Sequence, residues 1–246
     1  MNTIKINSKA TKVIAHRGMS GIERENTAAA FVAAGNRGYF GIETDVHKTS
    51  DGKYIIIHDD TTGRIADINL SVEGSDFNTL RNIRLADRTG KPREDLCMPS
   101  LEEYLRICAT YEKTAVLELK NPFLKDDIKN ILEIVKREYS IEKMIFISFD
   151  YQNLVYLRKL SSSASLQFLC ACDVNKELIE KLKLHDLDLD IEHSHLDENA
   201  VIYLHKNGIK INCWTVDDSA RAEKLAKWNV DYITTNILEG KTVEAN

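Results

Sequence analysis

The sequence predicts one α/β domain with the (β/α)8 fold of a TIM barrel. Short apolar segments alternate with segments of helical periodicity, and eight strands can be assigned along the chain. Such alternation is typical of a parallel sheet, and eight strands are the number that closes a barrel. The length of 246 residues agrees with the roughly 250 residues usual for this fold, so we expect residues 1–246 to form a single domain.

The first part of the chain contains two predicted barrel strands and a hairpin. A polar N-terminal segment leads directly into an apolar strand over residues 13–15. A helix follows, capped by Asn26 or Thr27, because either side chain can accept a hydrogen bond from the first turn and the alanines that follow favour helix. The second strand, over residues 41–46, then turns back through an Asp-Gly pair, which is a strong hairpin signal.

Residues 61–96 interrupt the alternation, since they contain few periodic apolar positions and many polar ones. We expect an irregular insertion over the catalytic face, because long loops in compact folds commonly cover a site. After it the alternation resumes, and the helix over residues 124–139 shows the apolar spacing of one buried face. The remaining strands are predicted over residues 115–120, 144–149, 166–171, 189–192, 209–216 and 230–235, with helices beginning near residues 99, 124, 150, 176, 197 and 218.

The hairpin is predicted to bring three titratable side chains together. With Asp51 and Gly52 as a two-residue turn, Asp45 pairs directly with His58, and paired residues point to the same face of a sheet. Glu43 lies two residues before Asp45 and shares that face. We therefore expect two carboxylates and an imidazole to converge in one patch.

Such a patch suits a divalent metal ion and an anionic ester. Two adjacent carboxylates repel each other unless a cation lies between them, and oxygen ligands favour Mg²⁺ or Ca²⁺. His16 and His58 can transfer protons near neutral pH, and Arg17 presents a planar set of donors to a phosphate or carboxylate. The alternative interpretation is a solvated strand end beside a turn histidine, which is the commoner case for any one of these residues alone.

Two further pairs lie at the ends of later strands. Glu118 and Lys120 are two residues apart and face the same barrel mouth, where they suit a third metal ligand and a phosphate contact. An ordinary buried Glu–Lys pair fits their spacing equally well. Phe149 and Trp214 are candidates for packing against substrate carbon atoms, with filling of the barrel core as the alternative.

Several short motifs follow one another along nearly the whole chain. They are Ala15-His16-Arg17-Gly18, Glu25-Asn26-Thr27, Glu43-Thr44-Asp45-Val46, Thr49-Ser50-Asp51-Gly52, His58-Asp59, Pro99-Ser100-Leu101-Glu102-Glu103, Glu118-Leu119-Lys120, Ser148-Phe149 and Trp214-Thr215-Val216. In these motifs the chain resembles the glycerophosphodiester phosphodiesterase family, in its bacterial, cytoplasmic type. The resemblance implies a TIM barrel that uses a divalent metal ion, usually Mg²⁺ or Ca²⁺, to hydrolyse glycerophosphodiesters to glycerol 3-phosphate and an alcohol.

The resemblance also implies a role for each of the charged residues and histidines selected above. The two histidines form the acid–base pair, in which we assign His16 as the base and His58 as the acid, with the exchanged roles as the alternative. By the same resemblance, the metal ion is bound by Glu43, Asp45 and Glu118, and the substrate phosphate is bound by Arg17 and Lys120.

Three positions depart from the family pattern. Arg24 stands where proline is usual, Asp217 follows Trp-Thr-Val in place of asparagine, and the closing turn, Thr235-Asn236-Ile237-Leu238, lacks a proline. We expect these departures to change the outer pocket and none to touch the predicted metal ligands or histidines.

The composition limits the partners and the location. A formal net charge of −5 provides no basic surface for nucleic acid. Five cysteines without a C-x-x-C pair favour reduced thiols, and no apolar stretch suits a signal peptide or a membrane span. We expect a cytoplasmic enzyme that acts on a small-molecule glycerophosphodiester without stable membrane insertion.

Three other functions compete with this one. A metal-independent glycosidase would use two of the carboxylates, but it would not need two histidines and an arginine. A related phosphodiester or lysophospholipid hydrolase of the sphingomyelinase D-like kind usually relies on disulfides and a secreted context. A non-catalytic phosphodiester-binding barrel would be indicated by a missing histidine or carboxylate, and none is missing.

Overall fold

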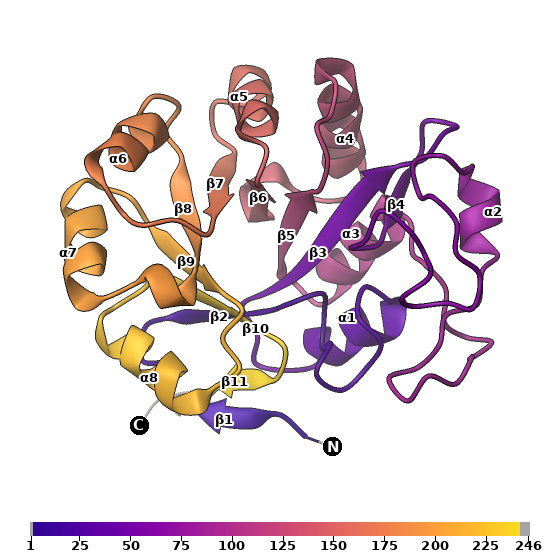
Figure 1. Cartoon of the computed structure of the whole chain (residues 1–246), viewed down its shortest axis with the longest axis horizontal. Helices are drawn as coiled ribbons and strands as arrows, with labels where there is room; N and C mark the ends of the chain where they lie inside the picture. The colour runs from indigo at the N-terminus through magenta and orange to yellow at the C-terminus, as the bar shows by residue number, and fades with distance from the viewer. Residues whose placement is uncertain (1, 242–246) are drawn as a thin grey trace.

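In a computed structural model, which describes residues 2–241, a closed barrel of eight parallel strands occupies the centre of the molecule (Figure 1). The sheet closes because the first barrel strand pairs with both the second and the last. The predicted TIM barrel is therefore confirmed. The barrel strands are β2 (Lys12–Ala15), β3 (Gly41–Lys48), β5 (Thr114–Leu119), β6 (Met144–Ser148), β7 (Ser165–Cys170), β8 (Asp188–Glu192), β9 (Ile211–Trp214) and β10 (Tyr232–Thr235).

Helices surround the strands and bury their apolar faces against them (Figure 1). Side-chain caps fix where several of them begin. Thr27 caps the helix that begins at Ala28, and Ser100 forms a reciprocal capping box with Glu103 at the start of the helix that begins at Leu101. The helices are α1 (Ala28–Gly35), α3 (Leu101–Thr110), α4 (Lys125–Glu138), α5 (Tyr151–Leu160), α6 (Lys176–Lys183), α7 (Glu198–Lys206) and α8 (Ser219–Lys227), with single 3-10 turns at η1 (Ile141–Lys143) and η2 (His193–His195).

The register predicted for the hairpin is wrong by one residue. β4 (Tyr54–Ile56) pairs with β3 so that Val46 lies opposite Ile56, which aligns Asp45 with Ile57 and not with His58. The connection has three residues, because the N–H of Thr49 bonds to the carbonyl of Lys53 and Gly52 adopts a φ of +80°. A glycine in this left-handed conformation is typical of three-residue hairpins.

His58 nevertheless reaches the mouth of the barrel. It follows the end of β4 within a bend, and its side chain lines the same cavity as Glu43. The predicted convergence is thus produced by a bend in the chain and not by direct pairing of the two strands.

The insertion over residues 61–96 is irregular, as predicted, apart from the short helix α2 (Phe77–Arg81). It has a small apolar core of its own, in which Ile65, Val72 and Leu80 pack on the side chains of Ile55 and Ile57. This core holds the insertion against the hairpin, on the right of Figure 1.

One small element lies outside the prediction. β1 (Ile4–Ile6) pairs in parallel with β11 (Leu238–Gly240) and forms a two-stranded sheet beside the barrel. Ile6 is fully buried there, whereas Ile4 is exposed. Within residues 2–241, no helix has both the length and the apolar character that a membrane crossing needs.

The barrel interior explains why polar groups gather at one end. Apolar side chains from several strands, including Ile14, Val116 and Ile145, fill its centre. The charged residues follow at the carboxyl ends of β2, β3 and β5, where TIM barrels carry their active sites.

Candidate active site

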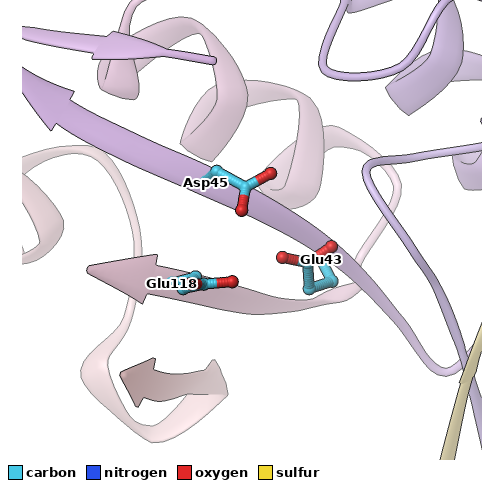
Figure 2. Close-up of side chains that lie close together, drawn as sticks. All are labelled: Glu43, Asp45 and Glu118. Carbon is cyan, nitrogen blue, oxygen red and sulfur yellow. The ribbon is translucent and has the colours of Figure 1, made fainter. Parts of the chain in front are cut away.

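Three carboxylates form a compact cluster at the mouth of the barrel. Glu43, Asp45 and Glu118 each offer an oxygen, and these oxygens lie within 4.8 Å of one another. Asp45 lies directly beside Glu118 in the register of β3 and β5, and Glu43 precedes Asp45 by two residues on the same face. Figure 2 shows the three carboxylates turned toward one another from these two strands. All three residues are buried.

Burial and mutual repulsion disturb the ionisation of this cluster. Burial, followed by the charges of Asp45 and Glu118, raises the pKa of Glu43 well above its ordinary value. Burial and the charge of Asp45 raise the pKa of Glu118 to about 7. Burial also acts against ionisation of Asp45, but Arg17 and Lys120 hold its pKa at about 2. When all three groups are ionised, their three negative charges exceed the two positive charges of Arg17 and Lys120 beside them.

The donor set fits a divalent metal ion. Oδ1 of Asp45 is buried and has no hydrogen-bond partner within residues 2–241. Lys120 Nζ lies 3.6 Å from this oxygen and instead donates to Glu118 Oε1 at 2.8 Å. The three buried carboxylates, one of which has an oxygen without a partner, provide the hard oxygen ligands that Mg²⁺ and Ca²⁺ prefer.

The loop after β2 is shaped to reach these carboxylates. Arg17 has a φ of +53°, and its N–H donates to Glu43 Oε2 at 2.7 Å while its Nε lies 3.3 Å from Asp45 Oδ2. Left-handed residues other than glycine are costly and cluster at functional sites. Gly18, with a φ of +74°, must be glycine, because a Cβ would lie 2.7 Å from the carbonyl carbon of Ala30.

Asn26 completes this corner. Its side chain is buried, donates to Asp45 Oδ2 at 2.7 Å and accepts from the hydroxyl of Thr44 at 2.8 Å. Thr27 is the helix cap, so Asn26 orients a carboxylate of the acidic cluster and does not cap α1.

His16 is held as a neutral imidazole with a defined tautomer. Its Nδ1 lies 2.8 Å from Asn236 Oδ1, and the amide of Asn236 is oriented because its Nδ2 donates to Asp217 at 2.6 Å. An amide oxygen only accepts, so the proton is on Nδ1 and the lone pair is on Nε2, which faces Glu43 at 4.0 Å. Burial and then the charge of Arg17 lower the pKa of His16 to about 4.

The departures from the family pattern therefore reach further than predicted. We expected none of them to touch the histidines, but Asn236 bonds directly to His16 and Asp217 holds Asn236. Arg24 also has a defined contact, because its Nε donates to the carbonyl of Ala86 at 2.5 Å and so ties the loop after β2 to the insertion.

His58 has a different partner. Its Nδ1 lies 2.6 Å from Asp59 Oδ1. The Nδ1 of His58 is therefore bonded to a carboxylate, whereas the Nδ1 of His16 is bonded to an amide oxygen. His47, which is fully buried, contacts the carbonyl of His58 through Nε2 at 3.2 Å and fixes its backbone. Burial lowers the pKa of His58, whereas Asp45 and Asp59 act to raise it.

The predicted site residues surround one cavity of about 100 Å³. Asp45 lies beside it, fully buried, and the other predicted residues line it: His16, Arg17, Glu43, His58, Glu118, Lys120, Phe149 and Trp214. Phe149 and Trp214 form an edge-to-face pair with ring centroids 5.7 Å apart on the wall. A larger cavity, of about 590 Å³, lies between the hairpin and α2, α3 and α4, and contains none of these residues.

Sequence reasoning missed the one further titratable residue, among those that the structure describes, that lines this cavity. Asp190 lines it from β8, is fully buried, and has no partner for its Oδ1 within the described residues. Burial and then the charge of Glu118 raise its pKa well above the ordinary value. The signal was present, since Asp190 stands between Leu189 and Ile191, which the alternation of a strand turns to the opposite face.

Comparison with known proteins agrees with this geometry. The model of the Glycerophosphoryl diester phosphodiesterase family matches residues 16–239. A glycerophosphodiester phosphodiesterase of Caldanaerobacter subterraneus subsp. tengcongensis is 29% identical over 92% of this chain and 94% of its own. A phosphodiesterase of Oleispira antarctica, solved in complex with the product sn-glycerol-3-phosphate, has a TM-score of 0.84 and 26% identity over 92% of both chains.

A second solved structure, a glycerophosphodiester phosphodiesterase of Parabacteroides distasonis, has a TM-score of 0.75 and 26% identity, covering 95% of this chain and 94% of its own. The family model spans all of the charged residues that surround the cavity. The chain therefore belongs to the glycerophosphoryl diester phosphodiesterase family.

Proposed function

We propose that the protein hydrolyses glycerophosphodiesters to glycerol 3-phosphate and an alcohol, with His16 and His58 as the acid–base pair. One observation carries the proposal: two imidazoles with different hydrogen-bond partners flank a single cavity beside a buried acidic cluster. The sn-glycerol-3-phosphate bound by the Oleispira antarctica relative supports the substrate class. The span of the family model, residues 16–239, supports one catalytic domain.

Glu43, Asp45 and Glu118 would hold one divalent metal ion, Mg²⁺ or Ca²⁺. When bound, such an ion supplies Lewis-acid stabilisation of the charge on a phosphoryl oxygen. Arg17 and Lys120 line the same cavity and would place their remaining donors on the phosphate.

The partners of the two histidines support a division of labour. His16 is neutral and keeps a lone pair on Nε2, so it can take a proton from the nucleophile, which is water or the neighbouring glycerol hydroxyl. Asp59 stabilises a proton on His58, so His58 can donate one to the departing alkoxide. Phe149 and Trp214 would pack against carbon atoms of the substrate.

The test is a substrate panel with purified protein. Glycerophosphocholine, glycerophosphoethanolamine, glycerophosphoinositol and lysophosphatidylcholine are incubated with Mg²⁺ or Ca²⁺, and glycerol 3-phosphate is measured by a coupled dehydrogenase assay. Release from the glycerophosphodiesters supports the proposal. Binding of glycerol 3-phosphate without turnover of any substrate would indicate a non-catalytic phosphodiester-binding barrel. Release of choline from lysophosphatidylcholine, with no turnover of the glycerophosphodiesters, would indicate the related lipid hydrolase. The cytoplasmic location stays a proposal that cell fractionation tests.

A further inference from the structure

A chain of alternating charges connects the insertion to both sides of the active site. His58 bonds through Nδ1 to Asp59, and Arg64 holds the other oxygen of Asp59 through Nε at 2.5 Å. The two terminal nitrogens of Arg64 bond to both oxygens of Glu25, at 2.7 Å and 3.0 Å. Glu25 in turn accepts from Arg17 Nη1 at 2.9 Å. One guanidinium therefore joins the carboxylate behind His58 to the carboxylate behind Arg17.

We propose that Arg64, a residue of the insertion, is a positioning residue. It holds His58 through Asp59, and it fixes the position of His58 relative to Arg17 through Glu25. The inference rests on the proposed function and adds a role for the insertion in that same site. Arg64 is at the rim, not at the reacting atoms, so it acts only through the two carboxylates.

The geometry favours positioning over a simple surface ion pair. The Arg64 side chain is 45% exposed, whereas the carboxylates that it joins are less exposed, at 27% for Asp59 and 18% for Glu25. Arg64 uses three nitrogens on two carboxylates, and a guanidinium offers these donors in a rigid planar fork that a lysine lacks. Both carboxylates are thereby fixed relative to each other, and so are the groups that they hold.

His58 needs such a support because its other anchor does not fix the ring. His47 contacts the carbonyl of His58, which holds the backbone but leaves the side-chain torsions free. Within residues 2–241, the His58 ring makes one hydrogen bond, to Asp59. Loss of Arg64 would release Asp59 and allow the imidazole to rotate.

The activity test compares Arg64→Ala with Arg64→Lys and with a matched control, Arg84→Ala. Arg84 is in the same insertion and its side chain is also 45% exposed, but it pairs with the exposed Glu94, away from the site. We expect Arg64→Ala to lower kcat for glycerophosphocholine by about 10- to 100-fold with KM changed by less than about threefold, since small misplacements of a catalytic group cost this much. Arg64→Lys should recover part of the loss, and Arg84→Ala should stay within about twofold of the parent protein.

A double variant and an added guanidinium separate positioning from general damage. Because Arg64 acts on His58 through Asp59, the combined loss of kcat in Asp59→Asn with Arg64→Ala should be smaller than the product of the two separate losses; the part that remains reflects the second route, through Glu25. Guanidinium at concentrations far below those that unfold proteins should raise the kcat of Arg64→Ala, because the vacated rim is open to solvent. Additive losses in the double variant, or a kcat for Arg64→Ala equal to that of Arg84→Ala, would overturn the proposal.

A measurement without turnover keeps this inference distinct from the proposed function. The Nδ1 proton of His58, shared with Asp59, should give a downfield proton resonance, which is assigned by its loss in His58→Ala. We expect Arg64→Ala to broaden or abolish it and Arg84→Ala to leave it in place. If the parent protein releases no glycerol 3-phosphate, the proposed function is wrong, while an unchanged resonance in Arg64→Ala would refute the positioning role by itself.

Discussion

Replacing Glu118 with glutamine should make the metal-free protein more stable, and the gain should depend on pH. Burial and Asp45 raise the pKa of this carboxyl from 4.5 to about 7 in the folded state. A raised folded pKa means that ionisation opposes folding, so the parent protein loses stability as the pH rises from 4.5 to about 7. Glutamine cannot ionise, and the variant does not suffer this loss.

The expected gain in the free energy of unfolding follows from the change in the pKa of Glu118. Each pKa unit corresponds to about 1.4 kcal/mol, so full ionisation of Glu118 costs the fold about 3 kcal/mol. For a domain of this size that corresponds to a rise in Tm of roughly 6–12 °C for the variant. At about pH 4, where the carboxyl is protonated in both folded and unfolded states, the parent and variant should be equally stable.

The assay is urea unfolding at about pH 4 and about pH 8 in EDTA, with the free energy of unfolding extrapolated to water. Glu133→Gln removes one carboxylate from the exposed face of α4, where the side chain is 62% exposed, and controls for the loss of charge alone. Added Mg²⁺ or Ca²⁺ should stabilise the parent protein and have much less effect on Glu118→Gln, because a ligand that binds the folded state stabilises it. An equal difference between parent and variant at both pH values would refute the electrostatic reasoning.

Three further predictions concern other parts of the site. Asn236→Leu should lower kcat by about 100-fold, because nothing would then fix the tautomer of His16, and steady-state kinetics test this. Asp190→Asn should raise the Tm in EDTA more at about pH 8 than at about pH 4, because the raised pKa of this buried acid makes its ionisation oppose folding, and a gain independent of pH would contradict that cause. Gly18→Ala should cost more than about 2 kcal/mol in urea unfolding, since its Cβ would lie 2.7 Å from backbone of α1; Gly52→Ala, with a similar φ of +80° and open space around it, should cost only about 1 kcal/mol.

The acidic cluster was predictable because it depends on strand geometry alone. Glu43 and Asp45 are two apart on one strand, and Glu118 ends the neighbouring strand, so all three must face the same mouth once the barrel forms. The hairpin register was not, because the same Asp51-Gly52 pair fits a two-residue turn or, as found here, a three-residue turn with Gly52 left-handed. His58 reached the site by a bend that no periodic pattern encodes.

The residues that hold the two histidines in place could not be predicted from the sequence either. Asn236 meets His16 across 220 positions, in a loop whose path is set by the ends of β2 and β10. Arg64 lies in an insertion without helical or strand periodicity, so its contacts with Asp59 and Glu25 follow from tertiary packing alone. Polar contacts between distant loops leave no repeating signal in the sequence.

We propose that a divalent ion on the acidic cluster and the two histidines act together in cleaving glycerophosphodiesters. The most direct measurement is the release of glycerol 3-phosphate from glycerophosphocholine by the parent protein, His16→Ala, His58→Ala and Glu118→Gln, first in EDTA and then with excess Mg²⁺ or Ca²⁺. We expect full turnover only for the parent protein and only after the metal is restored, with the turnover of each variant reduced by at least about 100-fold. Undiminished turnover in EDTA, or in either histidine variant with metal present, would contradict it.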